Sequence, residues 1–131
     1  MSERSGSELN RALCEALGWR RISRETFGEI DFIWVDPGGQ EHWELSSDEL
    51  PNFLDPGVFW PEFEKWRQAL PFPRPKFICS AMGSQDSLMD YMFEITTWLN
   101  TRQIFNAFAG RDDGLLTAAC RAWLKALEGM R

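Results

Sequence analysis

The chain has 131 residues, 44% of them hydrophobic, and a formal net charge of −6 at pH 7. A chain of this length can bury one hydrophobic core without disulfides or a bound metal. It has no run of the roughly 18 to 20 apolar residues that a bilayer span needs, and its polar N-terminus lacks the apolar stretch of a signal peptide. We therefore expect one soluble, cytoplasmic domain over residues 1–131, with residues 1–6 as a disordered tail.

The charge is divided unevenly along the sequence. Residues 25–64 carry 11 acidic residues and no lysine or arginine, whereas the rest of the chain has 14 basic and 9 acidic residues and a net charge of +5. A large field of one sign destabilises the protein that carries it but speeds association with an oppositely charged partner. Nucleic acid would be repelled, because a phosphate backbone needs a basic footprint. The acidic segment is therefore either a solvated surface or a binding surface for a basic partner.

The first half of the chain predicts a helix followed by strands. Apolar residues recur three and four positions apart over residues 7–17, which is the spacing of one helical face, and Gly18 ends this pattern. Residues 19–23 are expected to form a short strand. Alternating apolar residues around the turn sequence "DPGG" then predict a hairpin of residues 29–35 and 40–45.

The middle of the chain predicts a helix and then a strand. Residues 58–70 have helical spacing, and Pro61 is tolerable there because we expect it to lie in the first turn. Residues 76–81 are short, apolar and β-prone. Residues 86–99 fit a helical face and a strand face equally well, but their β-branched and aromatic composition favours a strand over 91–98.

The last third of the chain predicts two helices. The stretch "NTRQIFNAFAG" is expected to form a short helix that ends at Gly110. The stretch "GLLTAACRAWLKALEG" places its apolar residues on one face and predicts a C-terminal helix that Gly129 ends. Helices at both ends with strands between them predict an α/β/α sandwich with a central sheet of about four to five strands, and a two-layer α+β domain is the alternative.

The two ends of the chain resemble a known family. "LNRALCEALGW" (residues 9–19) and "LTAACRAWLKAL" (residues 116–127) are similar to the opening and closing motifs of the phage ABA-sandwich domain family, which consists of small bacteriophage proteins. The acidic stretch "ELPNFLDPGVFWPEFEKWRQAL" also looks like the central segment of that family. The resemblance implies a sandwich fold and a phage origin. It carries over no catalytic residue, because the family is functionally uncharacterised.

The sequence contains few patterns that are typical of catalytic or metal-binding sites. His42 is the only histidine, and in a strand it would share a side with Glu44 and could face Asp31 across the hairpin, but we expect an ordinary strand residue. "GRDDG" at residues 110–114 is expected to be a surface turn before the last helix and not a cation site. Neither a P-loop nor a G-x-S-x-G motif is present. We therefore expect no enzyme, no metal and no cofactor.

Cysteines and aromatic residues are both expected to belong mainly to the core. The three cysteines lie in apolar surroundings and are predicted to be reduced, buried thiols. The aromatic residues near the acidic run are also assigned to the core, with Trp60 as the exception because it lies beside the helical stripe. The three cysteines are Cys14, Cys79 and Cys120. The aromatic residues are Trp34, Trp43, Phe59, Trp60, Phe63 and Trp66.

Together these patterns favour a phage or prophage-encoded, non-enzymatic binding protein. Its acidic surface would engage a basic protein, such as a host nucleic-acid-binding or CRISPR-type defence protein, and inhibit it. One alternative is a structural or self-associating phage domain, and a less favoured one is a small metal-dependent hydrolase. The predicted partner-binding residues are Asp31, Glu41, Glu44, Asp48, Glu49, Asp55, Glu62 and Glu64 for charge, with Trp60 as the apolar anchor.

Overall fold

The computed structural model describes residues 6–43, 50–81, 90–99 and 101–130. The chain divides into two compact units, residues 1–52 and residues 53–131, and each unit is described by itself. Residues 1–5 of the expected tail lie outside the described residues, and the expectation of a single domain stays a prediction. In the part of the chain that is described, none of the helices combines the length and the apolar character that crossing a membrane requires.

The first unit begins with the predicted N-terminal helix. Helix α1 spans Gly6–Ala16, within one residue of the predicted bounds. Its apolar positions Leu9, Leu13 and Cys14 are buried, as the helical spacing requires. The chain then turns at Gly18, whose φ of 113° is a left-handed conformation that favours glycine.

A three-stranded antiparallel sheet follows, in the order β1-β2-β3. Strand β1 spans Arg20–Thr26, β2 spans Glu29–Val35, and β3 spans Glu41–Trp43. The predicted pairing of the second and third strands is confirmed over residues 33–35 and 41–43, whereas residues 44 and 45 lie outside the described residues. The longer pairing is between β1 and β2, and its register runs from Arg20 opposite Val35 to Thr26 opposite Glu29.

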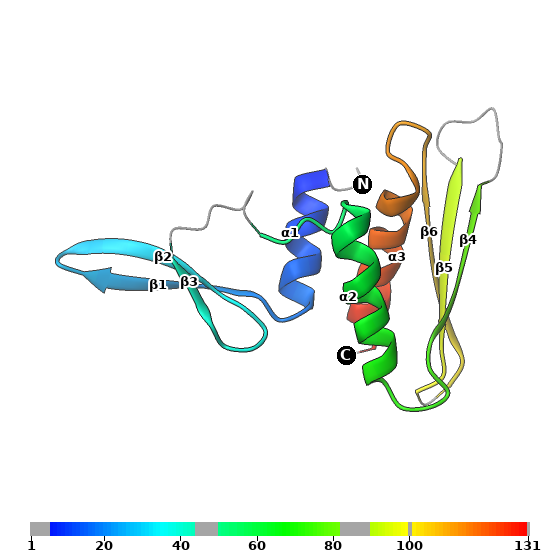
Figure 1. Cartoon of the computed structure of the whole chain (residues 1–131), viewed down its shortest axis with the longest axis horizontal. Coiled ribbons are helices and arrows are strands. Elements are labelled where there is room, and N and C mark those ends of the chain that lie inside the picture. The colour runs from blue at the N-terminus through cyan, green and yellow to red at the C-terminus, as the bar shows by residue number, and fades with distance from the viewer. Residues whose placement is uncertain (1–5, 44–49, 82–89, 100, 131) are drawn as a thin grey trace. The chain divides into compact units, whose positions relative to one another are not determined.

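The β1–β2 turn consists of only two residues. Phe27 and Gly28 both have positive φ, 53° and 81°, which is the backbone of a type I′ turn and matches the twist of a hairpin. Within the described residues β3 pairs with residues 33–35 of β2, and the turn end of β1 and β2 extends past this described part of β3 as a ribbon (Figure 1).

The second unit contains two helices and a second three-stranded antiparallel sheet in the order β4-β5-β6. Helix α2 spans Pro56–Ala69 and helix α3 spans Leu115–Gly129. Both helices were predicted, but α2 begins two residues earlier than expected, so Pro61 lies in its second turn and not in its first. The three strands of this sheet are β4 at Lys76–Ala81, β5 at Tyr91–Thr97 and β6 at Gln103–Ala109.

One face of the second sheet packs against both helices of its unit. Alternate residues of β5, including Phe93 and Ile95, are fully buried. The Phe93 ring lies 5.7 Å from that of Phe63 on α2, and the Phe63 ring lies 5.3 Å from that of Trp123 on α3. Edge-to-face contacts of this kind stabilise a core beyond the area they bury. The aromatic cluster, as we call it, consists of Phe53, Phe59, Trp60, Phe63, Trp66, Phe77, Phe93 and Trp123.

One expectation about strands was confirmed and one about a helix was wrong. Residues 91–97 form a strand, as their composition indicated. Residues 103–109 form strand β6 and not a helix, because they pair with β5 over its whole length and bury Ala107 and Ala109 on the face toward the helices. The described strands form two three-stranded sheets in place of one central sheet of four to five strands, so the architecture is α+β.

Gly129 has a packing role that differs from the predicted one. It does not end helix α3 but forms its last residue, and Met130 is the C-cap. A Cβ atom at Gly129 would overlap the end of the Phe105 ring of β6, so any larger residue there requires this ring to move. Two carbonyl groups of β6 also accept hydrogen bonds from α3, with Arg121 donating to Phe108 at 2.9 Å and Lys125 donating to Asn106 at 2.8 Å.

Candidate protein-binding surface

The turn end of the β1–β2 hairpin exposes three large apolar side chains. Phe27 is 102% exposed, Ile30 67% and Phe32 52%. Ile30 and Phe32 are two residues apart on β2 and therefore point to the same face of the ribbon, while Phe27 lies in the turn. The guanidinium of Arg21 lies 4.0 Å from the centre of the Phe32 ring and covers part of it. We call Phe27, Ile30 and Phe32 the hairpin tip.

The same face is buried at the other end of the hairpin. Trp34, two residues beyond Phe32, is only 2% exposed, and the guanidinium of Arg11 on α1 lies 5.7 Å from the centre of its ring. Opposite Trp34 on β3 is His42. The apolar face of β2 thus continues from a covered region into solvent without a change in residue type, which is unusual for a strand that only supports the fold.

Three acidic residues accompany the hairpin tip. Glu25, Glu29 and Asp31 are all exposed on β1 and β2. The nearest cation in sequence, Arg24, is engaged elsewhere, since its guanidinium donates to both carboxylate oxygens of Glu41 at 2.6 and 3.2 Å. The hairpin end therefore combines apolar anchors with three exposed carboxylates and, at the Phe32 ring, the cation of Arg21, which leaves a net negative charge; Asp31 is the predicted binding residue that lies within it.

The other predicted acidic residues of the first unit have different positions. Glu41 lies on β3 and is ion-paired with Arg24, so its charge is largely compensated. Glu44, Asp48 and Glu49 lie outside the described residues. Of the acidic residues predicted in this unit, the structure therefore places one, Asp31, in an exposed position near the hairpin tip.

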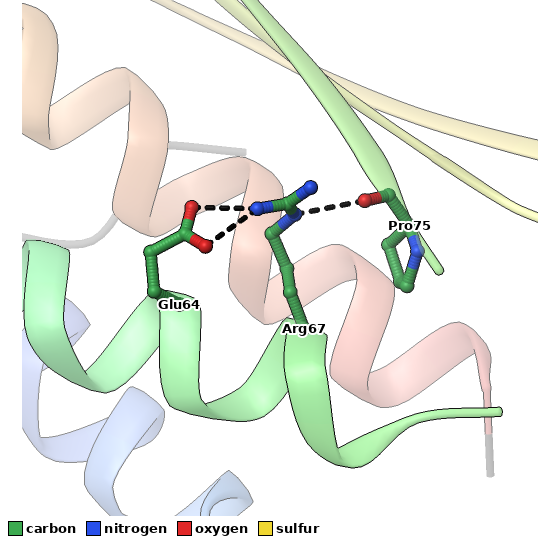
Figure 2. Close-up of polar contacts among 3 residues, drawn as sticks. All are labelled: Glu64, Arg67 and Pro75. Carbon is green, nitrogen blue, oxygen red and sulfur yellow. Dashed lines mark hydrogen bonds and ion pairs between the residues drawn. The ribbon is translucent and has the colours of Figure 1, made fainter. Parts of the chain in front are cut away.

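In the second unit, two of the predicted acidic residues are used by helix α2 itself. Asp55 is the N-cap, and its side chain accepts a hydrogen bond from the backbone N–H of Gly57 at 2.9 Å. Figure 2 shows Arg67 bound between Glu64, both of whose oxygens accept from it at 2.6 Å, and the carbonyl of Pro75, which accepts from Nε at 2.8 Å. These contacts hold the end of α2 to the residue before β4 and engage the Glu64 charge within the fold.

Glu62 and Trp60 complete the predicted set. Glu62 is exposed on α2. Trp60 is half-buried, because its ring contacts those of Phe59, Phe77 and Phe93 at centroid distances of 5.0, 5.7 and 6.4 Å. Its position in the aromatic cluster gives Trp60 a packing role. The acidic run is therefore distributed over two units, and four of its eight described carboxylates, those of Asp36, Glu41, Asp55 and Glu64, accept hydrogen bonds from other groups of the chain.

His42 pairs with a carboxylate other than the expected ones. Its Nε2 donates to Oδ2 of Asp36 at 2.9 Å, and its ring lies 5.3 Å from that of Trp19. This hydrogen bond, together with one from the backbone of Gln40, holds the pKa of Asp36 below its ordinary value. Within the described residues no group of three histidine, cysteine, aspartate or glutamate side chains is arranged to hold a metal ion, and Glu44 lies outside them.

The cysteines differ from one another. Cys14 and Cys120 are buried as predicted, and burial raises the pKa of the Cys14 thiol to about 12. Cys79 is exposed on β4, so the expectation of three buried thiols was wrong. Strand β4 is an edge strand, and most of its residues are exposed.

The "GRDDG" segment forms the predicted surface turn. Residues 111–113 are exposed, and the carbonyl of Asp113 accepts a hydrogen bond from the Thr117 hydroxyl at 2.7 Å in the first turn of α3. Arg111 donates to the buried Asp90 at 3.3 Å, which ties the turn to the start of β5. The segment is thus explained by its role in the fold.

Comparison with protein-family models, with curated proteins and with solved structures found no match to the chain. The hairpin tip thus has to be interpreted from its own geometry. Sequence reasoning missed it, because Ile30 and Phe32 were interpreted as one side of an ordinary alternating strand. The only available signal was Phe27 followed by Gly28, a two-residue turn with a large apolar side chain where asparagine or aspartate is usual.

Proposed function

We propose that the chain is a non-enzymatic binding protein that inserts the hairpin tip into a basic surface of another protein. The observation that carries the proposal is the combination of Phe27, Ile30 and Phe32, all more than half exposed, with the exposed carboxylates of Glu25, Glu29 and Asp31. Large apolar side chains supply most of the affinity of protein interfaces, and charge supplies association rate and selectivity.

The chemistry of the tip favours a nucleic-acid-binding protein as the partner. Carboxylates repel a phosphate backbone but attract the lysine and arginine side chains that bind it. A narrow hairpin can enter a groove that is shaped for a nucleic-acid strand. A host nucleic-acid-binding or CRISPR-type defence protein would be inhibited by such occupancy, and the resemblance of the chain ends to phage ABA-sandwich proteins supports a phage or prophage origin and a sandwich arrangement of helices and sheet.

The test is affinity capture from a bacterial lysate at low and high salt. Two variants remove one half of the surface each: Glu25→Gln/Glu29→Gln/Asp31→Asn removes the charge, and Phe27→Ser/Ile30→Thr removes apolar area. Glu128→Gln, at an exposed position of α3, is the matched control. We expect the wild type and the control to retain a basic protein that salt releases, and both hairpin variants to lose it. Equal retention by all four proteins would rule out the hairpin as the binding element.

A further inference from the structure

The second sheet has a face that the helices of its unit do not use. Phe77 and Phe93 point into the aromatic cluster, so the residues next to them in each strand point to the opposite face. On that face Ile78 is 56% exposed and Ile104 is 47% exposed. We call it the open face, and from the strand register its residues are Lys76, Ile78, Ser80, Met92, Glu94, Thr96, Ile104, Asn106 and Phe108.

The composition of the open face is unusual for a face in water. Antiparallel sheets with one solvated face normally carry polar residues there. Four of the open-face residues are large and apolar, and Trp98 just beyond β5 adds a fifth. Three strands about 4.8 Å apart and about 3.4 Å per residue give a face on the order of 15 by 24 Å, or roughly 360 Å² per copy, which is less than a standard interface and corresponds to a weak dimer.

The charges of the open face are arranged around one carboxylate. Glu94 lies at the middle of the central strand, opposite Ile78 on one side and Asn106 on the other. Lys76 lies opposite Thr96, and its ammonium is 5.6 Å from the centre of the Trp98 ring. These cationic and aromatic groups, together with Arg67 and Arg102, line a shallow hollow of about 430 Å³.

This arrangement is complementary to itself. Gln103 pairs with Thr97, so Arg102 lies one residue further on, level with Trp98. Both Lys76 and Arg102 are thus displaced from Glu94 in the same direction along the sheet. A two-fold axis that crosses the strands level with Ile95 would place Glu94 of each copy opposite Thr96 of the other, flanked by Lys76 on one neighbouring strand and by Arg102 just before the other.

We propose that the open face is the interface of a symmetric homodimer in which two sheets stack face to face. Two-fold dimers are the commonest assemblies of identical chains, and they require a surface that fits its own copy. A nucleic acid fits less well, because Glu94 lies in the middle of the face and its apolar residues are mostly not stacking platforms. The dimer uses the second sheet only and is independent of the hairpin tip.

A charge-reversal series measured by sedimentation equilibrium tests the dimer. Wild-type protein is expected to dimerise at low salt. Glu94→Lys places like charges opposite Lys76 and Arg102 and should weaken dimerisation at least about tenfold. The triple variant Glu94→Lys/Lys76→Glu/Arg102→Glu exchanges the signs and should restore it. Glu62→Lys on helix α2 makes the same charge change elsewhere and should have no effect.

Several outcomes would overturn the dimer. A wild type that stays monomeric up to about 1 mM lacks the interface altogether. Circular dichroism checks that the variants are folded. If all folded variants dimerise equally well, the open face is not involved. If the triple variant dimerises as weakly as Glu94→Lys, the two-fold arrangement is excluded. Loss of the dimer in Phe27→Ser/Ile30→Thr would assign self-association to the hairpin tip, whereas loss of partner capture with an intact dimer affects only the proposed function.

Discussion

The two sheets of this protein are built alike and used differently. Both are three-stranded antiparallel sheets in which neighbouring strands in sequence are neighbours in space. In the second sheet, Phe93 is fully buried and its ring lies among those of two helices. In the first, Phe32 occupies a comparable position on a central strand but is half exposed. Alternation along a strand identifies the residues that share a face, and the neighbouring elements decide whether that face is covered.

The largest expected contrast between the sheets is in stability. Phe63→Ala removes a ring that lies between Phe93 and Trp123 and should lower the free energy of unfolding by about 3–5 kcal/mol. Phe32→Ala at the hairpin tip should change it by no more than about 0.5 kcal/mol. Urea denaturation measures both values. Similar losses for the two variants would mean that the tip is part of a core and not a free surface.

The second expected effect concerns the contact between α3 and β6. Gly129→Ala places a methyl group against the Phe105 ring, which has to move, and should lower the free energy of unfolding by about 1–3 kcal/mol. Gly57→Ala, in the first turn of α2, is the control, because alanine is tolerated there and favours the helix. Thermal unfolding of the two variants separates a specific steric conflict from a general effect of replacing glycine, and equal melting temperatures would refute the close approach of Phe105.

The third prediction separates a cap from a binding residue. Asp55→Ala removes the hydrogen bond to Gly57 N–H and should destabilise the protein by about 1 kcal/mol. Asp55→Asn keeps an oxygen acceptor and should be close to neutral, although it removes the same charge. If both variants keep full stability in urea, Asp55 does not cap α2, and its assignment to partner binding regains support.

The smallest expected effect is a pH dependence in the first unit. Since His42 and the backbone of Gln40 hold the pKa of Asp36 below its ordinary value of 3.8, the ionised carboxylate is favoured by folding. Its contribution is present above pH 3.8 and is lost as the pH falls through the lower pKa of the folded protein. The melting temperature of Asp36→Asn should therefore lie below that of the wild type at pH 6, and the difference should shrink under acid conditions. A constant difference would exclude this linkage.

The sequence was informative wherever one local signal was sufficient. The apolar spacing predicted α1, α2 and α3 to within a few residues, because a helix hydrogen-bonds within itself and buries a stripe that recurs along the chain. Strand β6 was missed because "QIFNAFA" presents apolar residues at both spacings, and only pairing with β5 decides between them. That partner lies several residues upstream and is not visible in the segment itself.

The candidate site was less predictable than the fold. Composition identified the acidic run, but it could not show that Arg24 binds Glu41, that Asp55 caps a helix, or that Arg67 binds Glu64. Each of these contacts depends on side-chain distances that arise only after folding. The hairpin tip could not be recognised either, because a sequence does not show whether a phenylalanine is exposed or buried.

The hydrogen bonds from Arg121 and Lys125 to the carbonyls of β6 make the two edges of the second sheet different. An edge strand with unoccupied backbone groups can recruit further strands and lead to aggregation. On β6 two of the acceptors that an added strand would need are already taken by α3, whereas β4 forms the opposite edge. Strand addition at the β6 edge is therefore disfavoured, because an added strand would have to displace two hydrogen bonds from α3.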